Sequence, residues 1–219
     1  TRSPPARFAR YIAASDELSA AQSTSALEGT FAPLEDVLAA DPGDVGSQST
    51  ELVEVLNYVE TAEFAFAEMA DRGRLGVGLV EDMQGRLARG TPADTEQAGR
   101  VRTIQVAIGE AGGSIETARY VPPPPGPELE RSLRDLLDWS NGSRAKGRDP
   151  VVAAAMAHYQ FEALHPFNDG NGRIGRLLVV LHLMQGGALE DPLLSISPWF
   201  EQRRRAYQDR LLEVSASGD

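Results

Sequence analysis

Apolar residues recur every three or four positions along most of this chain, and this periodicity limits its fold more than any other feature. The pattern is present at residues 52–69, 79–87, 129–139, 151–164 and 172–185. Apolar side chains at this spacing share one face of an α-helix. The sequence therefore predicts an all-α helical bundle, and the stretch 151–164, apolar on nearly every side, predicts a central buried helix.

One segment departs from the helical pattern. Residues 103–108 are β-prone, residues 109–113 form a glycine-containing turn, and residues 118–121 can return antiparallel to the first stretch. This arrangement predicts a small β-hairpin at 103–121. The four prolines at 122–125 follow directly and favour an extended, rigid connector.

Composition excludes several classes of protein. The 219 residues suit one compact domain. The formal net charge of −11 argues against broad binding of nucleic acid or anionic membranes. The chain has no cysteine, so it has no disulfide framework and no thiolate nucleophile. No apolar run approaches the length of a membrane span and no signal peptide is evident, so we expect a cytoplasmic protein.

The polar residues that carry chemistry concentrate in the segment HPFNDGNGRIGR at 165–176, between two apolar helices. Pro166 ends the first helix, because the residue before a proline is disfavoured in the α region. The glycines of the loop let backbone N–H groups converge at the start of the next helix, which is a site for anions. Arg173 and Arg176 lie at the positive end of that helix, where cations are electrostatically unfavourable. Their presence there indicates a polyanion, such as the phosphates of a nucleotide.

Two further side chains in this segment suit phosphate chemistry. Asp169 offers a hard oxygen ligand for a Mg²⁺ ion shared with phosphate oxygens. His165 has a reference pKa of about 6.5, which suits a general base near neutrality. Each residue alone has a plainer interpretation, as a cap, a turn former or a solvated cation. Their order within one short segment favours a catalytic site.

The segment 165–176 resembles the signature of the Fic family, HPFx[D/E]GNGRxxR, and it matches at every defined position. A chance match over so many positions is negligible. The preceding residues 158–162 resemble the family's lead-in helix, and the similarity extends over roughly residues 18–214. The resemblance implies a Fic-type helical bundle with a small β-hairpin flap. We expect an N-terminal region at 1–50, which includes an inhibitory helix, and a catalytic core at 51–219 whose C-terminal extension is missing.

The resemblance also implies a protein adenylyltransferase, which transfers AMP from ATP to a Ser, Thr or Tyr hydroxyl of a target protein. By motif position, His165 is the base and Asp169 holds Mg²⁺. The flap at 103–121 would dock the target backbone by strand addition. The nucleotide would contact the anion pocket, the two arginines, the flap and an aromatic residue near adenine: Gly170, Asn171, Gly172, Arg173, Arg176, Ile108, Gly109 and Tyr207.

Near the N-terminus, Thr24 to Gly29 fits the family's inhibitory motif, [S/T]xxxE[G/N]. Thr24 and Glu28 are four residues apart, so on a helix they share a face. Gly29 can adopt the left-handed conformation that ends a helix. A bidentate pair between Glu28 and Arg176 would occupy the place that the γ-phosphate needs.

Three other functions stay open at this point. The same site could run in reverse and remove AMP from a modified protein. It could also transfer another phosphate-linked group from another donor. A non-catalytic helical adaptor that binds a nucleotide is a third interpretation, although an adaptor has no need of His165. Dimers are common among relatives, so a homodimer is also an expectation.

Overall fold

We describe the protein from a computed structural model, which gives residues 19, 21–32, 49–109, 115–142, 145, 147–190 and 194–217. Most of the expected N-terminal region at 1–50 lies outside these residues. The elements in chain order are α3 (Thr50–Arg72), α4 (Val77–Ala88), η1 (Ile115–Thr117), α5 (Pro127–Asn141), α7 (Pro150–Leu164), α8 (Asn171–Gln185), α9 (Ser197–Gln202) and α10 (Arg204–Ser217). In addition, residues 21–27 are helical. The all-α class predicted from the sequence is confirmed.

The helix boundaries follow from local chemistry. Ser49 precedes α3, and its hydroxyl accepts a hydrogen bond from the Leu52 N–H at 3.3 Å. Gly73 ends the same helix at φ 63°, in the left-handed region that glycine adopts without strain. Asp149 caps α7 by accepting from the N–H groups of Val151 and Val152, at 2.9 and 3.2 Å. These caps place α3 and α7 close to the starts of the predicted stretches.

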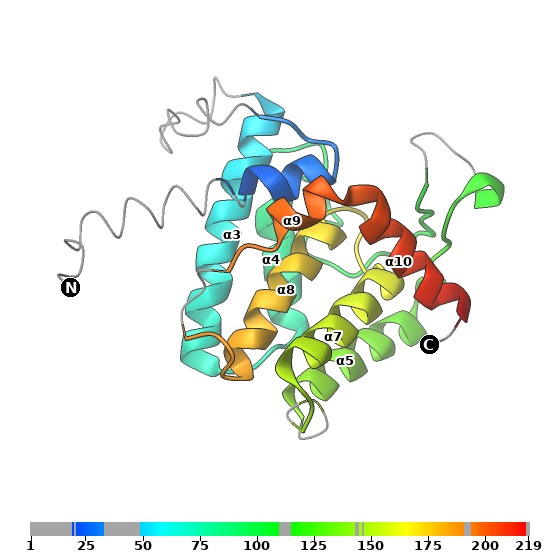
Figure 1. The fold of residues 1–219 in the computed structure, drawn as a ribbon. Helices are drawn as coiled ribbons and strands as arrows, with labels where there is room; N and C mark the ends of the chain where they lie inside the picture. Colours follow the sequence, from blue (N-terminus) through cyan, green and yellow to red (C-terminus); the bar gives the residue numbers. More distant parts are fainter. Residues whose placement is uncertain are drawn as a thin grey trace.

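The core is built around α8. This helix packs most extensively against α7, and it also contacts α3 and α4, while α5 lies against α7 (Figure 1). Its side chains are buried from Asn171 to Leu178, so its first two turns run through the interior. The signature segment at 165–176 therefore continues into the interior of the protein, where packing holds its arginines.

Helix α7 is less buried than its composition predicts. Val151, Val152 and Met156 are 64%, 52% and 44% exposed, whereas Phe161 and Leu164 are buried. Only one side of the N-terminal part of α7 faces α5 and α8. The expectation of a central buried helix therefore does not hold at this end, because an apolar composition does not by itself provide a neighbour for every face.

The predicted flap is much reduced. Among the described residues of 103–121, a single antiparallel bridge joins Ile108 and Tyr120. The Ile108 N–H donates to the Tyr120 carbonyl at 2.9 Å, and the Arg119 N–H donates to the Ile108 carbonyl at 2.8 Å. Gly109 lies where the two segments approach, because a Cβ there would lie 3.3 Å from Ala118 Cα.

The helical residues 21–27 cross the N-terminal end of α8, beside the upper part of α3 (Figure 1). The segment 21–32 is called the N-terminal segment below. Among the described residues, no helix is long and apolar enough to cross a membrane.

Candidate active site

The loop between α7 and α8 is fixed by its backbone conformation. His165 ends α7 with φ 47° and ψ 60°, a left-handed conformation uncommon for a residue with a side chain. Pro166 follows, as expected for a helix terminus. Gly170 at φ 80° then precedes the first residue of α8. These two left-handed residues reverse the chain and bring His165 beside the N-terminus of α8.

Asn171 and Phe167 hold the middle of this loop. The Asn171 side-chain amide donates to the Phe167 carbonyl at 2.8 Å and accepts from the Phe167 N–H at 2.9 Å. The Phe167 ring is fully buried in the core. Because both ends of the Asn171 amide are used in this way, its side chain shapes the loop. Its backbone N–H is the group that it can offer to an anion.

Arg102 anchors the loop from the preceding segment of the chain. Its side chain is 1% exposed and donates to the carbonyls of His165 at 2.8 Å and Pro123 at 2.5 Å. It also reaches the carbonyls of Ile104 at 3.1 Å and Leu164 at 3.4 Å. Arg102 thereby ties both arms of the flap region to the end of α7. No local sequence pattern points to Arg102, because an isolated arginine outside a motif carries no signal.

The His165 imidazole lines the cavity described below and is uncharged at neutral pH. Burial lowers its pKa to about 4, well below the ordinary value of 6.5, although the carboxylate of Glu28 opposes this shift. The pKa of His165 therefore lies below the reference value cited from the sequence. The functional consequence is favourable, because a neutral imidazole at pH 7 can accept a proton.

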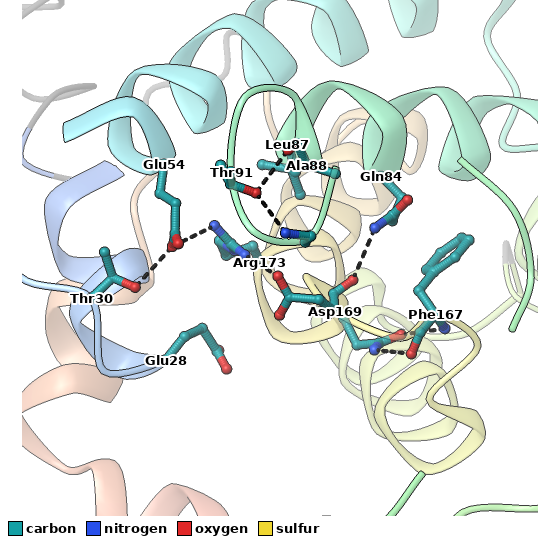
Figure 2. A network of polar contacts seen from close by, with 12 residues as sticks. Glu28, Thr30, Glu54, Gln84, Leu87, Ala88, Thr91, Phe167, Asp169 and Arg173 are labelled. Atoms are coloured by element: carbon teal, nitrogen blue, oxygen red, sulfur yellow. Dashed lines mark hydrogen bonds and ion pairs between the residues drawn. The ribbon is translucent and has the colours of Figure 1, made fainter. Parts of the chain in front are cut away.

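Arg173 bridges two carboxylates. Its side chain is 3% exposed, and its guanidinium pairs with Asp169 at 3.0 Å and with Glu54 of α3 at 3.2 Å. Figure 2 shows the Arg173 side chain between these two acidic groups, with Thr30 on the far side of Glu54. Asp169, the predicted metal ligand, is 53% exposed and thus open on its outer side.

Arg176 is held by the N-terminal segment. Its Nε donates to the Thr24 hydroxyl at 2.7 Å, and its Nη2 donates to the Thr24 carbonyl at 3.0 Å and to Glu28 Oε1 at 2.7 Å. The predicted pairing of Arg176 with Glu28 is present. It uses one guanidinium nitrogen and is not bidentate, because the Nε is bonded to Thr24.

The Glu28 carboxylate lies at the start of α8. Desolvation opposes its ionisation, but the attraction of Arg176 and the other nearby cations outweighs it, so the pKa of Glu28 is held below its usual value. Gly29 has φ 95°, the left-handed geometry predicted for it. A Cβ on Gly172 would overlap Glu28 Oε1, so the carboxylate occupies the space that this glycine leaves open.

A cavity of about 180 Å³ joins these groups. Ligand pockets in proteins usually measure roughly 300–1,000 Å³. With the N-terminal segment in place, the cavity is therefore smaller than a typical ligand site. Its walls contain Glu162 and several of the predicted site residues: Glu28, Ile108, Gly109, His165, Gly172, Arg176 and Tyr207.

Tyr207 and Glu162 line the cavity, and His158 contacts Tyr207. The Tyr207 hydroxyl lies 2.7 Å from His158 Nε2, and its ring stacks on Phe200 at 4.4 Å between centroids. Burial raises the pKa of Glu162 to about 8, although Arg176 opposes the shift. Glu162 is therefore protonated at neutral pH. The sequence analysis placed it in the lead-in helix without a role.

The Asp169 carboxylate fits a magnesium ion that is held jointly with phosphate oxygens. No group of three or more His, Asp or Glu side chains clusters as a metal site in the part of the chain that the structure describes. Mg²⁺ commonly takes only one or two carboxylates together with substrate phosphates and water. The exposed Asp169 carboxylate beside the α8 N-terminus suits that mode.

Comparison with known proteins identifies relatives of this chain. The sequence profile of the Fic/DOC family matches residues 75–183. The protein adenylyltransferase fic-1 of Caenorhabditis elegans is 42% identical over 95 residues, which span 43% of this chain and 17% of that protein. The protein adenylyltransferase Fic of Drosophila willistoni is 30% identical over 164 residues, which span 75% of this chain and 30% of that protein. The chain thus spans less than a third of the length of these relatives.

Solved structures give the same result for the fold. A Fic family protein from Desulfovibrio desulfuricans superposes with a TM-score of 0.78 at 28% identity, over 95% of this chain and 60% of that one. Fic-1 from C. elegans superposes with a TM-score of 0.69 at 25% identity, over 96% of this chain and 58% of that one.

Proposed function

Because this chain belongs to the Fic/DOC family, we propose that it transfers AMP from ATP to a hydroxyl group of a target protein, on a Ser, Thr or Tyr side chain. The observation that carries the proposal is the position of a neutral His165 in one cavity with the N-terminus of α8 and the buried Arg176. A base, an anion site and fixed cations are the groups that nucleotidyl transfer requires.

The reaction step assigned to His165 is proton transfer. The target oxygen forms a bond to the α-phosphorus of ATP as the bond from that phosphorus to the β-phosphate bridging oxygen breaks. The hydroxyl proton moves to the unprotonated ring nitrogen of His165, and pyrophosphate leaves with the bonding electrons. No covalent enzyme intermediate is needed.

In this proposal, the residues after His165 in the signature bind the phosphates of ATP. The N–H groups of Gly170, Asn171 and Gly172 face the anion at the helix terminus. Arg173 and Arg176 bind the outer phosphates, with Arg176 on the γ-phosphate. Asp169 would hold Mg²⁺, which would neutralise phosphate charge. Arg176 is fully buried, so its guanidinium is pre-oriented for this contact.

In this proposal, the N-terminal segment inhibits the enzyme when it is bound to Arg176. The Nε and Nη2 groups of Arg176 donate to Thr24 and Glu28, so the γ-phosphate has to compete with the N-terminal segment for that cation. The small cavity supports this interpretation. Gly29 allows the chain to turn away directly after Glu28.

Tyr207 and the flap complete the substrate sites. Tyr207, Ile108 and Gly109 line the cavity and would contact the adenosine. The target would add a strand to the flap at 103–121, for which the bridge at Ile108 provides a starting point. A proline ring at position 109 would force the two close arms apart, so Gly109→Pro should impair target modification more than ATP binding.

A second activity is favoured by the position of Glu28. Its carboxylate lines the same cavity as His165. A carboxylate there could orient a water molecule toward the phosphorus of an AMP-modified target, and the site would then remove AMP. Slower loss of AMP from a modified target in Glu28→Gly would support this reverse activity.

The proposal is tested by label transfer. The protein is incubated with Mg²⁺ and ATP, CTP, GTP or UTP, each labelled at the α-phosphate, and label in protein is followed for wild type, Glu28→Gly and His165→Ala. We expect transfer from ATP, more transfer by Glu28→Gly, and none by His165→Ala. Transfer from another nucleotide would reassign the donor. Nucleotide binding without transfer by either the wild type or Glu28→Gly would instead indicate an adaptor.

A further inference from the structure

We infer that Glu54 of α3 is a second inhibitory carboxylate, which withholds Arg173 from the nucleotide and at the same time anchors the N-terminal segment. The inference rests on the proposed function and concerns its regulation. Glu54 lies outside both the signature at 165–176 and the inhibitory motif at 24–29, and its contacts connect Arg173 of the signature with Thr30, the residue that follows the motif.

A single oxygen atom carries both contacts. Glu54 Oε2 accepts from the Thr30 hydroxyl at 2.8 Å and from Arg173 Nη1 at 3.2 Å. Thr30 belongs to the N-terminal segment and follows Gly29 directly in the sequence. Figure 2 shows its side chain pointing toward Glu54. Glu54 is 17% exposed and Arg173 is 3% exposed, so the pair lies largely out of water, where a charge pair is screened less than at the surface.

The backbone of the N-terminal segment positions Thr30 for this contact. The N–H groups of Gly29 and Thr30 donate to the carbonyls of Ala26 and Ser25, both at 3.0 Å. With Gly29 at φ 95°, this turn closes the helix and directs the chain from Glu28 toward α3. The same short turn therefore presents Glu28 to Arg176 and Thr30 to Glu54.

Each of the two arginines of the signature is consequently paired with a carboxylate that depends on the N-terminal segment or anchors it. Arg176 is paired with a carboxylate inside the segment, and Arg173 is paired with a carboxylate that holds the segment. With Asp169 included, three carboxylates face two guanidinium groups, so the positive charge of both arginines is neutralised before a polyphosphate arrives. Release of Glu28 or Glu54 would leave more positive charge for the phosphates.

The test compares Glu54→Gln with a matched control. Glu60 lies on the same helix and pairs with Arg86 and Arg89 at 2.8 and 3.2 Å, away from the cavity. Both Glu54→Gln and Glu60→Gln remove one carboxylate charge from α3 and keep the side-chain shape. ATP affinity with Mg²⁺ is measured by calorimetry in a His165→Ala background, in which no transfer consumes the nucleotide.

We expect Glu54→Gln to bind ATP about tenfold more tightly than its parent, a change of about 1.4 kcal/mol, and Glu60→Gln to match the parent. Amide hydrogen exchange without nucleotide provides a second readout. Exchange in residues 21–32 should be about tenfold faster in Glu54→Gln and unchanged in Glu60→Gln. Thr30→Val leaves α3 intact, and it should raise this exchange in the same way.

Two results would overturn the inference. One is an ATP affinity and an exchange rate for Glu54→Gln that both equal those of Glu60→Gln. The other is weaker ATP binding, which would make Glu54 a residue that orients Arg173 for the phosphates. Failure of the proposed function is a separate result: no variant with His165 intact, Glu28→Gly included, would then transfer AMP. The exchange comparison needs no nucleotide and still decides the role of Glu54.

Discussion

Arg102→Met should destabilise the whole protein, although residue 102 lies outside the catalytic signature. The guanidinium donates to four backbone carbonyls, and three of these hydrogen bonds are 3.1 Å or shorter. A hydrogen bond to a charged group contributes about 1.5–3 kcal/mol, and a buried acceptor left without a donor costs about 1–3 kcal/mol. Removing the buried charge recovers part of its desolvation cost, so we expect a net loss of about 3 kcal/mol in the free energy of unfolding.

The assay is thermal and urea unfolding followed by circular dichroism. For a chain of this size, 1 kcal/mol shifts Tm by about 2–4 °C, so the melting temperature should fall by about 6–12 °C. Arg131→Met is the control, because Arg131 is 60% exposed and pairs at the surface with Glu128. The reasoning is refuted if Arg102→Met lowers the stability by less than about 1 kcal/mol, or no more than the control does.

Three further predictions concern the site. His165→Ala should abolish AMP transfer and change ATP affinity less than about threefold, as calorimetry would show, since other groups bind the phosphates; a large loss of affinity would contradict its assignment as the base. Asp169→Ala should weaken ATP binding with Mg²⁺ and leave binding in EDTA unchanged, whereas equal loss in both would remove the metal role. Glu162→Gln should gain thermal stability relative to wild type as the pH rises. Glu162 keeps its proton up to about pH 8 in the folded state, whereas its ordinary pKa is 4.5. The contribution of Glu162 to wild-type stability therefore declines between pH 4.5 and 8, and the glutamine variant lacks this decline. Parallel Tm curves for the two proteins would refute that raised pKa.

The sequence predicted those parts of the molecule that depend on local physics. Helical periodicity located α3, α4, α5, α7 and α8, since each must bury one face, but it did not indicate α10, which has no buried residue. Pro166 and the glycine-rich loop predicted a break at the point where α8 begins, and Gly29 predicted the left-handed turn after Glu28. The pair between Glu28 and Arg176 followed from a motif, and the structure changes only its geometry.

The remaining features depend on residues that are distant in the sequence. Arg102 reaches carbonyls 62 and 63 residues away, and Glu54 reaches Arg173 across 119 residues. Neither distance is visible in a local pattern. The shifted pKa values of His165 and Glu162 arise from burial, which a sequence does not specify for a single side chain.

In the flap, a local sequence preference predicted more structure than the described residues form. A run of β-prone residues predicted two short strands, but the described residues form one bridge. Two short segments without a third strand gain little from pairing, so among the described residues the pairing is limited to Ile108 and Tyr120. Arg102 provides a different means of fixing this region, by binding the carbonyls of Ile104 and Pro123 on the two arms.

The central claim is that this site transfers AMP and that Glu28 restrains it through Arg176. It is tested most directly by incubating Glu28→Gly with ATP labelled either at the α-phosphate or at the γ-phosphate, beside wild type and the double variant Glu28→Gly with His165→Ala. We predict label in protein from the α position only, well above wild type, and none in the double variant. Label from the γ position would show phosphate transfer, and α-label in Glu28→Gly no higher than in wild type at saturating ATP and Mg²⁺ would contradict the restraint by Glu28.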